Sequence, residues 1–249
     1  MNRCHPPLPA NRKTGALAWL LGLLFLAAGS LPAQVTYTWN SGDILTGGIT
    51  PAGVTTITTV DTLNIVTGND HDFNGRLVTN NGTVSWQAGR IRSGSGGAFT
   101  NNATWNDTSD TYAFNNDYGG AGTTFINAAG GTYNKLSGAT YFDTTFANAG
   151  TINVSGGTLS FRAGGTFTNG SVVGSSGPGV VQLTSGTLTM TGNITATNFL
   201  FNGGTLAGDQ TFTGSVLNWQ NGVWNSANTT TIASNSKRRA SLCGLGAYI

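Results

Sequence analysis

The stretch from Phe146 to Phe161 reads FANAGTINVSGGTLSF and contains both of the repeated motifs that decide the fold. Apolar and polar residues alternate over 151–154 and again over 158–161, and a Gly pair separates the two runs. Alternation with period two places the apolar side chains of a strand on one face and its Thr, Asn and Ser side chains on the other. The stretch therefore predicts short, half-buried β-strands joined by tight glycine turns.

Copies of two motifs recur along the chain. The first motif reads apolar-x-Asn-x-(Gly/Ala)-Thr, and we expect its Asn side chains to form an internal hydrogen-bonded ladder: Asn80, Asn101, Asn127, Asn148 and Asn169. These positions are separated by 21, 26, 21 and 21 residues. The second motif reads apolar-x-x-(Gly/Ala)-x-apolar and begins at Trp86, Leu136, Val154, Leu183, Phe201 and Trp219. The period is therefore close to 20 residues.

A repeat of this length cannot bury its own apolar face and has to stack on its neighbours. The sequence predicts an all-β, right-handed parallel β-helix, or β-solenoid, with coils of about 18–21 residues that lie ~4.8 Å apart. Roughly nine coils are expected at this period. The alternative fold is an antiparallel β-sandwich, which has similar short strands but does not explain motifs at a nearly fixed interval.

The chain divides into four segments. Residues 1–33 are expected to be a signal peptide, because basic residues precede a short apolar core and small residues follow it. Residues 34–60 are expected to form N-terminal capping strands, and residues 61–235 the solenoid repeats. Residues 236–249 form an atypical basic tail, expected to come from a truncation or a frameshift, with a short functional tail as the alternative.

Composition excludes several classes of protein. Charged residues make up 8% of the chain and Glu is absent, which argues against a helical fold. Between residues 34 and 235 there are five Lys or Arg and nine Asp, so a nucleic-acid partner is not expected. We expect no transmembrane segment in the mature chain. One of the two Cys residues lies in the leader, so no internal disulfide is expected after its removal.

Catalytic chemistry is not expected. A glycosidase needs two carboxylates that work together, whereas the acids here are scattered through turns and insertions: Asp107, Asp110, Asp117, Asp143 and Asp209. The segment after the leader has a single His, His71. Arg90 and Arg92 are expected to project outward from a strand, where they need no acidic partner. We therefore predict that the chain is not an enzyme and has no cofactor.

Two further groups of residues are candidates for binding. Asp70, Asp72 and Asn74 match the first half of a calcium loop, but the position for its bidentate Glu is occupied by Asn81, and a polar turn explains the pattern equally well. Four aromatic residues are expected in an insertion over 105–122, where they could form a ligand face suited to sugars: Trp105, Tyr112, Phe114 and Tyr118. The alternative is a local cap over the coil.

The repeats over about residues 75–225 resemble those of bacterial exported β-helix proteins, such as autotransporter passenger-like, haemagglutinin-like and PEP-CTERM-type repeat surface proteins. The resemblance implies a secreted, extracellular or cell-surface location and a structural or adhesive role. A surface glycan or another cell-surface protein is the expected partner. The competing function is that of a carbohydrate-active β-helix enzyme or a sugar-binding module.

Overall fold

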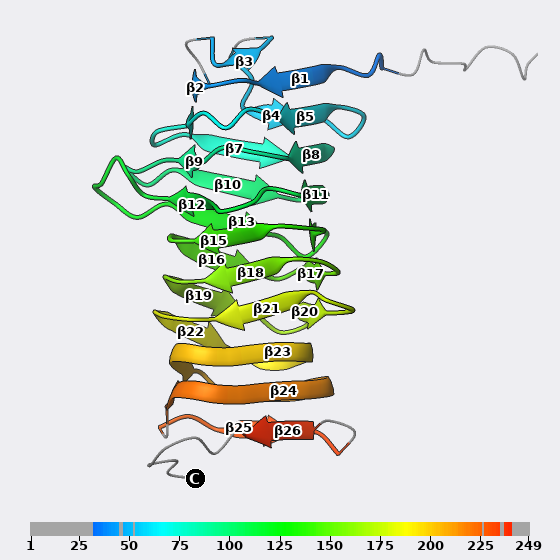
Figure 1. The fold of residues 1–249 in the computed structure, drawn as a ribbon, viewed down its shortest axis with the longest axis vertical. Helices are drawn as coiled ribbons and strands as arrows, with labels where there is room; N and C mark the ends of the chain where they lie inside the picture. The colour runs from blue at the N-terminus through cyan, green and yellow to red at the C-terminus, as the bar shows by residue number, and fades with distance from the viewer. Residues whose placement is uncertain (1–31, 45–46, 52, 226, 235–236, 241–249) are drawn as a thin grey trace, which may run out of the picture. The chain divides into compact units, whose positions relative to one another are not determined.

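The computed structural model of the chain describes residues 32–44, 47–51, 53–225, 227–234 and 237–240. Nearly all of the expected signal peptide at 1–33 lies outside the described residues. Gln34–Ile249 form one unit. The regular structure described in this unit consists of β-strands, which stack in parallel as a β-solenoid of about eight turns (Figure 1). This confirms the predicted solenoid, with about one turn fewer than expected, and excludes the antiparallel sandwich.

The strands form three columns, each made of equivalent strands from successive coils. Column 1 contains β1 (Thr36–Trp39), β5 (Thr62–Ile65), β8 (Thr83–Trp86), β11 (Thr104–Asp107), β14 (Thr132–Lys135), β17 (Thr151–Val154) and β20 (Val172–Ser175). Column 2 contains β2 (Gly42–Asp43), β6 (His71–Asp72), β9 (Ile91–Arg92), β12 (Tyr112–Asn115), β15 (Ala139–Phe142), β18 (Thr158–Phe161) and β21 (Val180–Leu183). Column 3 contains β4 (Thr56–Ile57), β7 (Leu77–Asn80), β10 (Ala98–Asn101), β13 (Thr124–Asn127), β16 (Thr145–Asn148), β19 (Gly164–Phe167) and β22 (Thr187–Met190).

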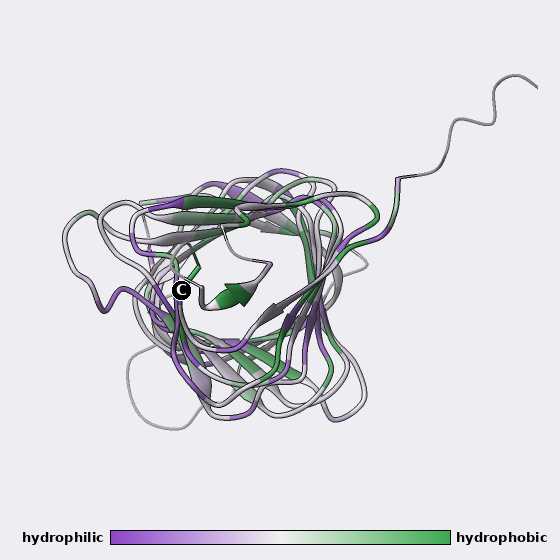
Figure 2. Cartoon of the chain, turned by 90° about the horizontal axis from the view of Figure 1, so that it is seen from above, coloured by the Kyte–Doolittle hydropathy of each residue, from purple (hydrophilic) through white to green (hydrophobic). Residues whose placement is uncertain are grey.

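Two long strands continue all three columns. β23 (Gly192–Ala207) pairs in turn with β20, β21 and β22, and β24 (Gln210–Trp224) lies parallel to it in the next coil. β25 (Thr230–Ile232) and β26 (Lys237–Ala240) pair with β24 in parallel. Figure 2 looks along the stack and shows the strands arranged around a common interior.

The interior is built from the alternating positions of the short strands. In β8, Val84 and Trp86 are fully buried, whereas Thr83 and Ser85 on the outer face are partly exposed. Because the register is conserved from coil to coil, aromatic rings stack on aromatic rings. The ring of Phe125 lies 6.2 Å from that of Phe99 and 5.0 Å from that of Phe146 in the adjacent coils of column 3. Such ring pairs add about 0.5–1.5 kcal/mol each to the burial of apolar area.

The solenoid extends beyond the predicted boundaries of its repeats at both ends. Residues 34–60 were expected to be capping strands, yet β1 pairs in parallel with β5 and so belongs to column 1. β3 (Ile49–Thr50) is the segment that deviates from the columns, because it pairs with β1 in the antiparallel direction. At the other end, β26 comes from the tail at 236–249 and still pairs with β24 in register. Backbone pairing therefore extends beyond the predicted last repeat.

Candidate functional site

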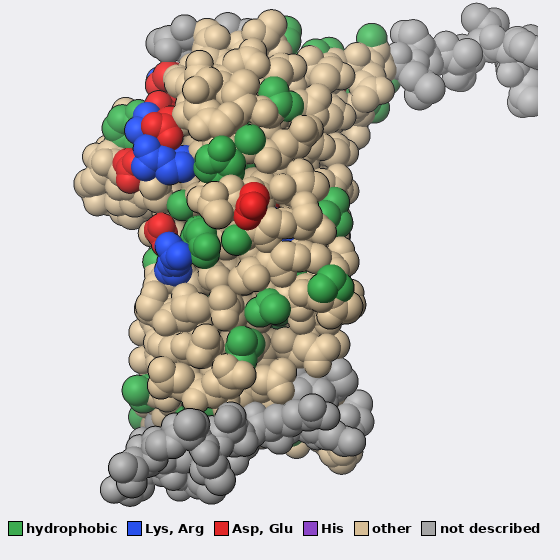
Figure 3. All heavy atoms as spheres, viewed as in Figure 1, with side chains coloured by type: hydrophobic (Ala, Val, Ile, Leu, Met, Phe, Trp, Pro, Cys, Tyr) green, Lys and Arg blue, Asp and Glu red, His purple; other side chains and the backbone are tan. Residues whose placement is uncertain are grey.

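Charged side chains gather along column 2, within its strands and in the turns next to them. We name this group the charged edge, and it consists of Asp43, Asp70, Asp72, Arg76, Arg90, Arg92, Asp117, Asp143 and Arg162. Figure 3 shows that most charged side chains on the visible face lie along one side of the stack. In a chain with so few charges, this concentration makes the edge the first candidate for a functional site.

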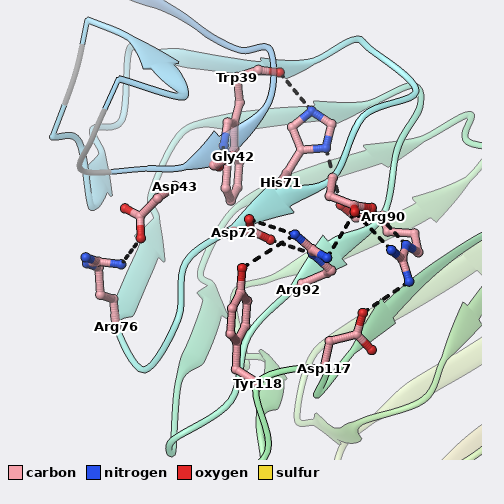
Figure 4. A network of polar contacts seen from close by, with 11 residues as sticks. Trp39, Gly42, Asp43, His71, Asp72, Arg76, Arg90, Arg92, Asp117 and Tyr118 are labelled. Atoms are coloured by element: carbon pink, nitrogen blue, oxygen red, sulfur yellow. Dashed lines mark hydrogen bonds and ion pairs between the residues drawn. The ribbon is translucent and has the colours of Figure 1, made fainter.

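The centre of the charged edge is a pair of bidentate contacts between adjacent coils (Figure 4). Arg90 donates from Nε and Nη2 to the two oxygens of Asp70 at 2.8 and 2.9 Å. Arg92 donates in the same way to Asp72 at 2.7 and 2.9 Å, because β6 and β9 place these two residues opposite each other. The hydrogen bond from Arg90 holds the pKa of Asp70 below its usual value. The Asp70 carboxylate is thus ionised and engaged at neutral pH.

A loop from the following coil completes the group. Asp117 accepts a hydrogen bond from Nη1 of Arg90 at 3.1 Å, so this guanidinium connects three successive coils. The ring of Tyr118 lies 5.5 Å from the guanidinium carbon of Arg92, within the range of a cation–π contact. Tyr118 is 43% exposed, which leaves part of its ring accessible to solvent.

His71 lies inside the solenoid beneath the charged edge and is fully buried. Its Nε2 is 3.1 Å from the carbonyl oxygen of Trp39, and its Nδ1 is 3.3 Å from that of Arg90, so the ring lies between backbone groups of the two neighbouring coils. Burial lowers the pKa of His71, which favours the neutral imidazole at pH 7. The His71 side chain therefore contributes to the packing of neighbouring coils and is not accessible from solvent.

The calcium-loop interpretation of 70–74 disagrees with these contacts. Asp70 and Asp72 face arginine side chains, and Asn74 is exposed in the turn that follows. Among the described residues, no group of three or more His, Cys, Asp or Glu side chains could hold a metal ion. Arg90 and Arg92 pair with Asp70 and Asp72, although their expected outward positions required no acidic partners. Both outcomes have one cause, since the 20-residue spacing aligns each Asp with an Arg of the next coil.

The predicted aromatic ligand face does not form a single surface. Trp105 and Phe114 are fully buried, because they occupy inward positions of β11 and β12. Tyr112 is partly buried and packs against the core, and only Tyr118 is exposed in the loop. Residues 105–107 and 112–115 of the expected insertion therefore belong to the regular strands β11 and β12. Trp105 and Phe114 are corrected to core residues.

The predicted asparagine ladder contains four of its five expected members. In column 3, Asn80 donates to Asn101, Asn101 to Asn127, and Asn127 to Asn148, with Nδ2–Oδ1 distances of 2.7, 2.8 and 2.8 Å. All four side chains are buried. Asn169 lies outside the ladder, because β19 places Phe167 opposite Asn148. Asn169 comes two residues later, in an exposed turn.

The structure also contains an interior polar cluster that sequence reasoning missed. Asp107 and Lys135 lie opposite each other in β11 and β14 and form an ion pair of 3.0 Å with no exposure of either side chain. Aligning the strand TYNK at 132–135 with TINV at 151–154 would have found it, because Lys135 then occupies the inward position of Val154. We name this group, with Ser109, Tyr133 and Thr140, the buried cluster.

No protein-family model matches the chain, and no curated protein or solved structure matches it either. The part of the chain that the structure describes contains no helix long and apolar enough to cross a bilayer. The arrangement of polar residues is therefore the main evidence on function. These polar residues connect coils, since each of the seven ion pairs among the described residues joins two adjacent coils.

Proposed function

We propose that the chain is a non-catalytic repeat protein, secreted or located at the cell surface, with a structural or adhesive role. The observation that carries this proposal is that the ion pairs, inside and outside the solenoid, bridge one coil to the next. The asparagine ladder does the same in column 3. Side chains engaged in this way stiffen a stack of coils.

The alternative of a sugar-binding module is favoured by one specific feature, the surroundings of Tyr118. An accessible tyrosine ring beside the guanidinium of Arg92 and the carboxylate of Asp72 offers an apolar face and directional polar groups together. Pyranose rings present the complementary pattern of C–H faces and hydroxyl groups. If the protein is adhesive, this part of the charged edge is where a glycan would bind.

An assay of the full chain against immobilised glycans and soluble polysaccharides separates these functions. For the structural role we expect neither glycan binding nor release of reducing ends. Binding that is lost in Tyr118→Ser but kept in Leu136→Ser supports the sugar-binding module, because Leu136 is similarly exposed, at 45%, in a different turn. Release of reducing ends by the purified chain would overturn the non-catalytic proposal.

The location is tested separately. Protease added to intact cells of the source bacterium should degrade the protein if it lies at the surface, and secreted protein should be found in the medium. Retention of the full-length protein in the soluble cell fraction would contradict the proposed location.

A further inference from the structure

The buried cluster brings an amine and a carboxyl group together in the dry interior of the solenoid. Asp107 and Lys135 are the inward-facing last residues of β11 and β14, and the same position in the flanking coils is apolar, with Trp86 on one side and Val154 on the other. Both side chains are fully buried. The Lys135 amine and the Asp107 carboxyl group therefore lie next to each other between the apolar side chains of Trp86 and Val154 in the flanking coils.

Every oxygen of the Asp107 carboxyl group has a partner in this cluster. Its Oδ1 contacts Lys135 Nζ at 3.0 Å and accepts from the backbone N–H and the hydroxyl of Ser109 at 2.8 and 2.7 Å. Its Oδ2 accepts from the phenol of Tyr133 at 2.5 Å and from Thr140 Oγ1 at 2.7 Å. The Lys135 ammonium is held by the Ser109 carbonyl at 2.6 Å and by Thr140 Oγ1 at 2.7 Å. The reacting groups are thus fixed in one orientation.

A buried ion pair of this kind is one proton transfer away from a neutral pair. Desolvation penalises both charges, and moving a proton from Nζ to the carboxylate along their hydrogen bond removes both at once. Burial lowers the pKa of Lys135, which favours the free amine in this exchange. The neutral amine is a nucleophile, and the protonated carboxyl group carries a leaving hydroxyl.

We propose that Lys135 and Asp107 condense to an amide bond that links two adjacent coils covalently. The Nζ lone pair attacks the carboxyl carbon of Asp107 and forms a tetrahedral intermediate. One C–O bond then breaks, the oxygen departs with the carboxyl proton and one proton from Nζ as water, and the C–N bond remains. One amine and one carboxylic acid yield one amide and one water, with no oxidant, cofactor or added reagent.

Tyr133 and Thr140 are the residues positioned to assist this step. Both donate to Oδ2, where negative charge develops in the tetrahedral intermediate, and such preorganised donors lower the barrier to acyl transfer. Burial raises the pKa of Tyr133 well above its usual value, so its phenol remains a proton donor at neutral pH. Oδ2 therefore becomes the oxygen of the amide, with Tyr133 as its hydrogen-bond donor, while Oδ1, which lies 3.0 Å from Nζ, departs as water with the carboxyl proton and one proton from Nζ.

The bond would have a clear physical consequence for this chain. It closes a loop between residues 107 and 135, and cross-links of this size restrict the unfolded chain much as disulfides do. The segment after the predicted leader contains one Cys, so a disulfide within a single chain is not an option there. An amide cross-link would also resist reduction.

Mass spectrometry of the purified full chain tests the inference. The intact mass should be one water lower than the mass calculated for the observed N-terminus, whereas Lys135→Arg should show the full calculated mass. An aspartyl succinimide is also one water lighter, so protease digestion has to yield a branched peptide that contains both residue 107 and residue 135. A second variant, Asp107→Asn, should lose ammonia in place of water.

The rate of formation tests the assigned role of Tyr133. In Tyr133→Phe we expect the cross-linked fraction to accumulate about 100-fold more slowly, the typical contribution of one preorganised hydrogen-bond donor to an oxyanion. The full calculated mass in folded wild-type chain, or a mass deficit without the branched peptide, would overturn the proposal. The mass and the branched peptide of the wild-type chain alone show whether the amide bond is present, so this test does not depend on folding of the variants.

Discussion

Replacement of Asn127 by Ala tests whether the asparagine ladder stabilises the solenoid. Asn127 is one of the two residues with ladder partners on both sides, and its side chain makes three hydrogen bonds. It accepts from Asn101 at 2.8 Å and donates to Asn148 at 2.8 Å and to the carbonyl of Thr151 at 3.0 Å. Each buried hydrogen bond contributes about 0.5–1.5 kcal/mol net, so the substitution should reduce the free energy of unfolding by about 2–4 kcal/mol.

The neighbours limit the size of this effect. After the substitution, Asn101 Nδ2 still faces the carbonyl of Thr132 at 3.3 Å, and Asn148 Oδ1 still accepts from the N–H of Gly150 at 3.2 Å. The side-chain amides of Asn101 and Asn148 each keep one hydrogen-bond partner. The expected loss of unfolding free energy is therefore smaller than if both amides were left buried without any partner. The mechanism predicts partial, local destabilisation of column 3.

Urea unfolding followed by tryptophan fluorescence measures the change, with the slope of the transition used to check that cooperativity is retained. The matched control is Asn153→Ala, because Asn153 is exposed and donates one hydrogen bond of 3.2 Å to Asn134 in the adjacent coil. The control should change stability by less than about 0.5 kcal/mol. Equal losses in the two variants would show that burial of the ladder contributes nothing, and the reasoning would be refuted.

Three other predictions follow from the fold. Gly157→Ala should destabilise the chain much more than Gly170→Ala, as thermal melting would show: both have positive φ, but only at Gly157 would a Cβ collide with the backbone of the adjacent coil. Trp105→Ala should reduce the free energy of unfolding by about 3–5 kcal/mol and Tyr118→Ala by less than about 0.5, and comparable values in urea titration would contradict their assignment to core and surface. Because Arg90 lowers the pKa of Asp70, the contribution of this pair is complete above about pH 4, the unfolded value, and disappears as pH falls through the lower folded value. Acid unfolding of Asp70→Asn should therefore depend less on pH than that of the wild type, and an unchanged profile would argue against this linkage.

The sequence by itself was sufficient for the architecture. Its repeated motifs and period-two alternation predicted parallel coils, since only stacking at a constant interval buries the apolar side chains and pairs equivalent asparagines. The column Asn80, Asn101, Asn127 and Asn148 follows from that pattern, even across the longer spacing of 26 residues. Alternation also predicts that the second and fourth residues of a strand face inward.

The residue that each side chain contacts in the adjacent coil was decided only by the tertiary structure. The alignment of Arg90 with Asp70 and of Lys135 with Asp107 depends on how many residues each turn contains, and turns of unequal length shift the register by amounts that periodicity does not reveal. The same uncertainty misplaced Asn169 and assigned Trp105 and Phe114 to a surface. Local alternation determines which way a side chain points, but its partner is determined by coil stacking, which brings together residues about 20–30 positions apart along the chain.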